Sequence, residues 1–150
     1  MRLPTTFYKF GPHTIPDTQV FYKSKFCLGL VNLKPIVPRV AARVNDLHPD
    51  EAVDMMLSAQ KIGKVIENYY SGTSLSMVMQ DGPEAGQTVP HVHMHVIPRK
   101  AHDYANNDDI YDDLDKRKAV DNEERQPRTE DDMAEEADKL RVFFDSYNDE

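Results

Sequence analysis

Three histidines alternate with apolar residues in one short stretch of this 150-residue chain: His91, His93 and His95. Side chains of an extended strand point alternately to its two faces, so the three imidazoles share one face. The other face carries the intervening residues Val92, Met94 and Val96. We predict a strand over residues 89–97 whose apolar face enters the core. Neighbouring histidines would lie roughly 6.6 Å apart at the backbone, from a rise of about 3.3 Å per residue.

Two kinds of chemistry suit three neighbouring imidazoles. Neutral imidazole binds zinc or copper, but a fourth ligand would have to come from elsewhere, and the chain has one cysteine, Cys27, and no HExxH helix. Imidazole is also a nucleophile near neutral pH. One histidine can therefore attack phosphorus while its neighbours offset the phosphoryl charge and protonate the leaving oxygen. A solvated strand face without chemistry is the third interpretation.

The residues before the histidines favour phosphate over metal. Glycine lets backbone amides approach an anion closely, and glutamine and threonine side chains add hydrogen-bond donors. Two such clusters precede the predicted strand, Gln80-Asp81-Gly82 and Gly86-Gln87-Thr88. We interpret them as an amide-lined loop that presents a phosphate to the histidines.

Charge is spread unevenly along the chain, whose formal net charge is −8. Residues 1–100 hold 11 Lys and Arg against 8 Asp and Glu, whereas residues 101–150 hold 7 against 18. Duplex nucleic acid needs clustered cations, so a nucleic-acid polymer is not an expected partner. Neither a membrane span nor a secretory signal is predicted. With a lone cysteine, these features predict an intracellular protein, and we expect the cytoplasm, with the nucleus or mitochondrion as further compartments.

The remaining elements are expected to position this site within one domain over residues 1–150. Residues 1–16 are interpreted as an irregular arm, and strands are predicted over 18–23, 25–33 and 73–80, with the proline-rich stretch 34–38 breaking any ladder. A helix is predicted over 48–70, with one buried stripe of Val53, Met56, Leu57, Ile62, Val65, Ile66 and Tyr69. Residues 101–128 are predicted to be a mobile polar segment. A last helix is predicted over 129–146, with Thr129 as its N-cap and one face of Met133, Ala137, Leu140 and Phe144.

The stretch from Gln80 to Lys100, with the three histidines inside it and Pro98-Arg99-Lys100 at its end, resembles the fragile histidine triad (Fhit) branch of the histidine triad (HIT) superfamily. Phe10-Gly11, Leu30-Val31-Asn32, Ile110-Tyr111 and the last helix extend the resemblance over nearly the whole chain. It implies an α+β fold, with a HIT-like antiparallel sheet of about five strands and two helices. It also implies a homodimer that hydrolyses dinucleoside polyphosphates, diadenosine triphosphate to AMP and ADP, through a covalent nucleotidyl-histidine.

The resemblance implies a role for each site residue. His93 is the nucleophile, His95 contacts phosphate and assists the leaving group, and His91 supports the site. The other substrate-binding residues are His13, Asn32, Gln80, Gly86, Gln87, Thr88 and Val89, and the base pocket is formed by Phe10, Ile15 and Leu30. Magnesium or manganese is implied as an ion bound to the substrate. Tyr111 is implied as a phosphorylation target, against the alternative of a partly exposed tyrosine that packs on the sheet.

One stretch departs from the family pattern. After Val37-Pro38 the family runs into Gly-His and an apolar strand, whereas here Arg39 follows at once and the chain is shorter by roughly eight residues, more than the usual strand length. We predict a shortened strand over 39–44 and, if the gap stays open, neighbouring strands with unpaired edges. A misplacement of about 1 Å can cost on the order of a hundredfold in rate. A catalytically impaired nucleotide-binding signalling protein and a metal-binding protein are therefore the alternatives to a hydrolase.

Overall fold

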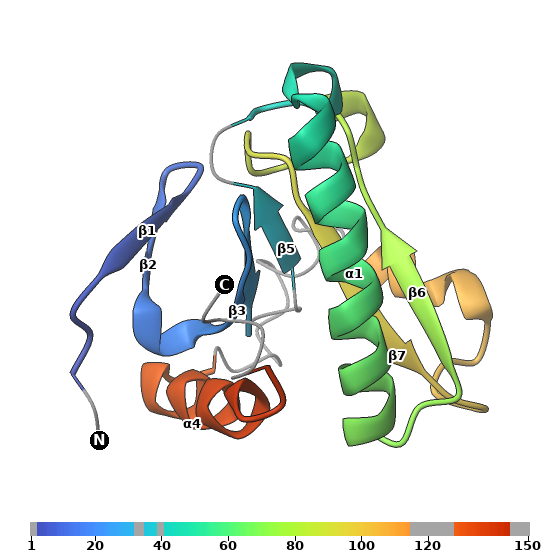
Figure 1. Ribbon diagram of the computed structural model, residues 1–150. Helices are drawn as coiled ribbons and strands as arrows, with labels where there is room; N and C mark the ends of the chain where they lie inside the picture. Colours follow the sequence, from blue (N-terminus) through green and yellow to red (C-terminus); the bar gives the residue numbers. More distant parts are fainter. Residues whose placement is uncertain (1–2, 32–34, 39–40, 115–127, 145–150) are drawn as a thin grey trace.

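A five-stranded antiparallel sheet forms the centre of the protein in the computed structural model, which describes residues 3–31, 35–38, 41–114 and 128–144 (Figure 1). The strands lie in the order β3 (Val20–Lys23), β4 (Cys27–Leu30), β5 (Pro35–Pro38), β7 (Met94–Arg99) and β6 (Ser74–Val78). The predicted α+β class and the five-stranded antiparallel sheet are confirmed, with three α-helices rather than two in the described residues.

Different elements cover the two faces of this sheet. Helix α1 (Pro49–Tyr69) packs across β4, β5 and β7 on one face. The hairpin of β1 (Phe7–Phe10) and β2 (His13–Pro16) packs on the other face. Because side chains alternate along β5, Ile36 joins the core beneath α1 and Val37 joins the smaller core beneath the hairpin. The register pairs Pro35 with His95, so His95 belongs to the hairpin face.

Helix α1 lies where it was predicted, with Pro49 in its first turn, but the predicted buried stripe is mostly wrong. Val53, Met56, Leu57 and Tyr69 are 59%, 58%, 50% and 39% exposed. The buried residues are Met55, Ser58, Ala59, Ile62, Gly63 and Ile66. A Cβ added to Gly63 would stand 2.7 Å from Leu75. Side-chain size as well as hydrophobicity therefore decides which face meets the sheet.

The N-terminal residues form a hairpin rather than the predicted irregular arm. β1 and β2 pair from Phe7 opposite Pro16 to Phe10 opposite His13. Gly11 begins the connecting turn with a left-handed φ of 55°, a conformation that favours glycine. A Gly-Pro pair marks turns and loops equally well, so the sequence did not separate a hairpin from an arm.

Strand β5 is the stretch that was predicted to break the ladder. Its two prolines occupy the first and last positions of a four-residue strand, where a missing amide donor is tolerated. β5 pairs with β4 at three positions and with β7 at two, so it closes the sheet but only briefly. Strand β7 is longer than β5. Pro98 was predicted to end the histidine strand, but it lies inside β7, past the positions that pair with β5.

The shortened strand predicted over residues 39–44 is wrong where the structure describes it. Residues 41–43 have no strand conformation, and a 3-10 turn, η2, follows at Val44–Asp46. Residues 39 and 40 lie outside the described part of the chain. Because β5 already completes the sheet, the residues after it connect to α1 instead of adding a strand.

Two helices follow β7 in the acidic part of the chain. Helix α4 (Glu130–Arg141) is capped by Thr129, whose hydroxyl accepts a hydrogen bond from the amide of Asp132. The helix ends earlier than predicted, so Phe144 is buried from the turn that follows it, whereas Ala137 and Leu140 are buried on the helix itself and Met133 is partly buried. Helix α2 (Ile110–Leu114) lies within the segment predicted to be polar and mobile, and its two end residues are 3% and 5% exposed. The segment is rich in charged residues, so its composition did not reveal the buried Ile110 and Leu114. Residues 115–127 lie outside the described part.

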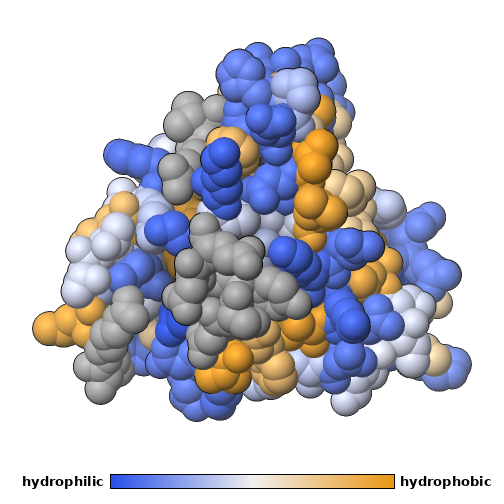
Figure 2. Space-filling model, in the orientation of Figure 1, coloured by the Kyte–Doolittle hydropathy of each residue, from blue (hydrophilic) through white to orange (hydrophobic). Residues whose placement is uncertain are grey.

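The surface is largely hydrophilic in the orientation of Figure 1, with hydrophobic patches between the charged side chains (Figure 2). Across the described residues, no helix combines the length and the apolar character needed to cross a bilayer.

Candidate active site

The three histidines lie together, but only the last of them lies in the strand that was predicted to carry all three. Strand β7 starts at Met94, so His91 and His93 precede it. The amide of Val92 donates to the carbonyl of Ala41 at 2.7 Å, which ties this stretch to the connection after β5 rather than to a strand. The predicted strand therefore begins too early: the alternating pattern extends back to Val89, whereas β7 starts at Met94.

The imidazoles are packed against one another and against the hairpin. His91, His93 and His95 are 6%, 7% and 9% exposed. The ring of His93 stands edge-on to His95 and to Phe10, with centroids 4.9 and 5.0 Å apart, and Phe10 also lies 5.6 Å from His91. Rings on both sides therefore hold the His93 imidazole in one orientation.

A hydrogen bond within its own segment sets the tautomer of His93. The Nδ1 of His93 lies 2.7 Å from the carbonyl oxygen of His91. A carbonyl only accepts hydrogen bonds, so Nδ1 carries the proton and donates it. In the neutral imidazole, Nε2 is then the nitrogen that carries the lone pair, which is the requirement for a nucleophile.

His91 has the opposite tautomer and holds two remote segments together. Its Nδ1 accepts a hydrogen bond from the amide of Gly11 at 3.0 Å, and its Nε2 meets the carbonyl of Pro38. Nδ1 is thus an acceptor and Nε2 a donor. The imidazole joins the turn of the hairpin to the end of β5, which suits the supporting role expected for it.

The three residues predicted to form a base pocket belong to one apolar cluster. Phe10 and Ile15 come from the hairpin and pack against a buried group that includes Leu30 on β4. The other members of this cluster are Tyr8, Val20, Leu28 and Val37. The cluster lies on the hairpin face of the sheet, beside the imidazoles, because Phe10 belongs to both groups.

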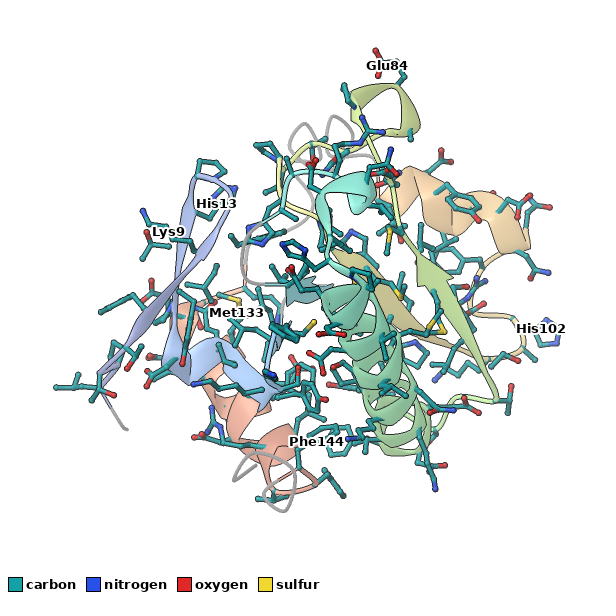
Figure 3. All side chains as sticks on the ribbon, turned by 45° about the horizontal axis from the view of Figure 1, so that its top comes forward. Lys9, His13, Glu84, His102, Met133 and Phe144 are labelled. Atoms are coloured by element: carbon teal, nitrogen blue, oxygen red, sulfur yellow. The ribbon has the colours of Figure 1, made fainter. Side chains whose placement is uncertain are left out.

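One predicted substrate-binding residue, His13, lies away from the imidazoles. His13 is exposed near the tip of the hairpin, with its ring centroid 6.3 Å from that of Phe10 (Figure 3). Asn32 lies outside the described residues.

The predicted phosphate loop is built on two glycines and two glutamines. Gly82 and Gly86 have left-handed φ values of 101° and 96°. A Cβ on Gly86 would stand 2.6 Å from the side-chain nitrogen of Gln80, so Gln80 packs directly over that glycine. The side chain of Gln87 accepts from the amide of Gly82 at 2.7 Å and donates to the carbonyl of Ala42 at 2.8 Å. Gln87 therefore braces the loop with the side chain that was expected to bind phosphate.

The end of the loop meets the hairpin. Thr88 is exposed, whereas Val89 is 2% exposed. A Cβ on Gly11 would stand 2.6 Å from Cγ1 of Val89, so the hairpin turn rests on this valine. A contact between Val89 and phosphate would have to use its backbone amide, because its side chain is packed.

An ion pair that was not predicted as part of the site anchors the same loop. The guanidinium of Arg43 donates to the carboxylate of Asp81 at 2.9 and 3.2 Å, and the amide of Val44 donates to it at 2.9 Å. The hydrogen bond from Arg43, followed by that from Val44, holds the pKa of Asp81 below its ordinary value. Arg43 and Val44, in the connection that follows β5, therefore position the predicted phosphate loop. A pairing across 38 residues leaves no local signal in the sequence.

The described residues contain no group of three His, Cys, Asp or Glu side chains placed to hold one metal ion. The rings of His93 and His95 contact each other, and His91 and His93 direct nitrogens to backbone groups. These hydrogen bonds commit one nitrogen of His93 and both nitrogens of His91 to the backbone.

Comparison with known proteins settles the family. Residues 14–102 match the model of the HIT domain. The chain belongs to the HIT family. A bifunctional bis(5'-adenosyl)-triphosphatase/adenylylsulfatase FHIT of Arabidopsis thaliana is 42% identical, over 92% of this chain and 84% of that relative. A bis(5'-adenosyl)-triphosphatase of Dictyostelium discoideum is also 42% identical, over 94% of this chain and 95% of that relative.

A solved structure repeats the fold over nearly the whole chain. The crystal structure of Plasmodium falciparum diadenosine triphosphate hydrolase in complex with Cyclomarin A matches with a TM-score of 0.74 and 28% identity, covering 97% of this chain and 89% of that one. The resemblance to the Fhit branch of the HIT family, drawn from the histidines and their flanks, is thereby confirmed.

Proposed function

We propose that this HIT protein hydrolyses dinucleoside polyphosphates, with diadenosine triphosphate as the type substrate and AMP and ADP as products. The observation that carries the proposal is the tautomer of His93, whose Nδ1 proton is held by the carbonyl of His91 so that Nε2 bears the lone pair. The relatives named as bis(5'-adenosyl)-triphosphatases support the substrate class.

The first half of the reaction transfers the nucleotidyl group to the protein. Nε2 of His93 forms a bond to the α-phosphorus while the bond from that phosphorus to the bridging oxygen breaks. ADP departs, and His95 donates a proton to its oxygen. The nucleotidyl-imidazolium that forms is cationic, and the carbonyl of His91 stabilises it through the Nδ1 proton.

The second half returns the protein to its starting state. Water attacks the phosphorus and gives a proton to His95, the bond to Nε2 breaks, and AMP leaves. Magnesium or manganese would arrive on the substrate phosphates, since oxygen donors of phosphate suit these ions. The apolar cluster of Phe10, Ile15 and Leu30 would hold the base of the nucleotide that becomes AMP.

Replacing the nucleophile tests this proposal. His93→Ala should reduce kcat for diadenosine triphosphate more than about a thousandfold, as loss of a covalent nucleophile does elsewhere, with nucleotide binding largely retained. The matched control is His102→Asn, because His102 is an exposed histidine outside the site with a positive φ that asparagine tolerates (Figure 3). Undiminished turnover by His93→Ala would refute the assignment.

A nucleotide-binding signalling protein with little turnover is the second candidate. The observation that favours it is the brevity of β5, which pairs with β7 at two positions, beside the last histidine. A single-turnover measurement separates the two functions. A rapid burst of AMP supports the hydrolase, whereas tight binding without product supports signalling.

We also propose that the protein pairs with a second copy of itself. Val53, Met56 and Leu57 form an exposed apolar face on α1, and Met77 of the neighbouring strand β6 is 42% exposed. β6 is the last strand of the sheet, so its outer edge has no partner strand among the described residues. A two-fold pairing of these faces would bury the apolar side chains and the open edge together, as expected of a homodimer.

A further inference from the structure

The connection between β5 and α1 touches both parts of the site that are expected to carry chemistry. The carbonyl of Ala41 accepts a hydrogen bond at 2.7 Å from the amide of Val92, which lies between two of the histidines. The carbonyl of Ala42 accepts one at 2.8 Å from the side chain of Gln87, in the predicted phosphate loop. Residues 41–44 therefore join the histidine segment to that loop.

Arg43 holds the start of the same loop in two ways. Its guanidinium donates to both carboxylate oxygens of Asp81, at 2.9 and 3.2 Å, which is the bidentate geometry of a specific arginine–carboxylate pair. It also lies over Gly82, where an added Cβ would stand 3.1 Å from Cζ. The amide of Val44 donates to the same carboxylate at 2.9 Å. The turn at residues 81–82 is thus fixed from the side of the connection.

The anchored turn is tied to the far end of the loop. The amide of Gly82 donates to the side chain of Gln87 at 2.7 Å, and the amide of Gln87 donates to the carbonyl of Gly82 at 3.0 Å. The loop is therefore closed on itself and follows Asp81 when Asp81 moves. Figure 1 shows η2 and the loop after β6 side by side near one end of α1. The anchor at Asp81 sets where the amides of residues 86–89 stand.

We propose that Arg43 and Asp81 are positioning residues for the reaction, whose ion pair holds the loop where it presents the attacked phosphate to His93. The inference rests on the proposed hydrolase function and adds two residues to it. In this role neither residue touches the substrate, because the pair acts through Gly82 and Gln87. The side chains of Arg43 and Asp81 are 47% and 31% exposed, and exposed ion pairs contribute little to overall stability. The effect of the pair is therefore expected mainly on the loop.

Loss of the pair should lower kcat with little change in KM. A displaced loop still admits the nucleotide, whereas attack by Nε2 of His93 requires accurate placement of the phosphorus, and about 1 Å of misplacement can cost on the order of a hundredfold. We expect Arg43→Met to reduce kcat for diadenosine triphosphate about tenfold and to change KM less than about threefold. The same loss of kcat is expected for the para-nitrophenyl ester of AMP, because both substrates share the attacked phosphate.

A variant of the opposite charge separates positioning from direct electrostatics. Asp81→Asn removes an anion and keeps an oxygen for the amide of Val44. A direct attraction of Arg43 to the substrate would make the two variants change KM in opposite directions. Positioning predicts that both lower kcat, and that the double variant loses about tenfold rather than the roughly hundredfold expected of independent effects.

Two further variants serve as controls. Lys139→Met breaks another exposed ion pair, with Glu135 at 2.7 Å on α4, which packs against β3, and kcat should be unchanged. Arg43→Lys keeps the charge without the planar fork and should recover only part of kcat. Unchanged kcat in Arg43→Met and Asp81→Asn, opposite changes in KM, or losses that multiply in the double variant would overturn the positioning role.

Hydrogen exchange tests the anchor without turnover. With AMP bound, the amides of Gly82 and Gln87 should exchange about tenfold faster in Arg43→Met than in the unaltered protein, and at the same rate in Lys139→Met. If the unaltered protein cleaves neither substrate, the hydrolase function fails, but faster exchange in Arg43→Met and Asp81→Asn would still support a loop positioned for the phosphate by this pair. Equal exchange in these variants and the unaltered protein would reject it.

Discussion

Gly11→Ala is expected to destabilise the protein by about 2–5 kcal/mol, because the added methyl group meets Val89. The new Cβ would stand 2.6 Å from Cγ1 of Val89. This valine is 2% exposed and β-branched, so it cannot rotate away cheaply. Overpacking of this kind costs about 1–3 kcal/mol. The left-handed φ of 55° at Gly11 costs alanine roughly a further 1–2 kcal/mol.

A double-mutant cycle divides the expected loss into its two causes. Val89→Ala removes the obstructing methyl group, so adding Gly11→Ala to that variant should cost only the backbone part, roughly 1–2 kcal/mol. The coupling between the two substitutions should therefore be about 1–3 kcal/mol. Urea unfolding of the four proteins measures the free energy of unfolding of each.

The same cycle has a kinetic readout, because the amide of Gly11 donates to Nδ1 of His91 at 3.0 Å. A hairpin pushed off Val89 weakens that hydrogen bond, so kcat should fall in Gly11→Ala and recover in part in the double variant. If the two losses of stability add within about 0.5 kcal/mol, the hairpin turn does not rest on Val89 and the reasoning is refuted.

Three further predictions concern other parts of the chain. Burial, followed by the nearby Asp54, raises the pKa of the Cys27 thiol to about 12, so iodoacetamide should label it only after denaturation; labelling of the folded protein would contradict this. The hydrogen bond from Arg99 lowers the pKa of Asp103 from 3.8 to about 2. The unaltered protein should therefore be more stable than Asp103→Asn above pH 3.8, and this difference should disappear as the pH falls through about 2. Urea midpoints measure the difference, and a difference that grew as the pH fell would contradict the prediction. Leu57→Glu places a charge in the proposed dimer surface and should yield monomers by sedimentation at concentrations where the unaltered protein is dimeric; an unchanged dimer would place the interface elsewhere.

The sequence predicted the elements whose information is local. Thr129 and the apolar residues of α4 form a capped amphipathic helix because each signal lies within one or two turns. The histidines were likewise found by their spacing, and the alternating residues Val92 and Val96 are buried as expected. The tautomer of His93 depends on a carbonyl two residues away, so even this detail is encoded locally.

Features that depend on packing between distant segments could not be predicted in the same way. Hydrophobicity placed Val53 and Leu57 inside, but the close approach at Gly63 turns α1 so that both are exposed. Proline chemistry argued against β5, yet a four-residue strand with its prolines at the two ends loses few ladder hydrogen bonds. The pairing of Arg43 with Asp81 joins a connection to a loop, and neither residue type is unusual in its own context.

The hydrogen bond from His93 to the carbonyl of His91 closes within two residues. The backbone beside the reacting imidazole therefore sets which nitrogen carries the proton, while the rings of Phe10 and His95 set its orientation. A shortened connection, such as the one after β5, can change the shape of the site around a ligand. It does not change which nitrogen of His93 carries the proton. Changes in distant segments can therefore alter the affinity and the selectivity for a ligand while Nε2 of His93 stays unprotonated.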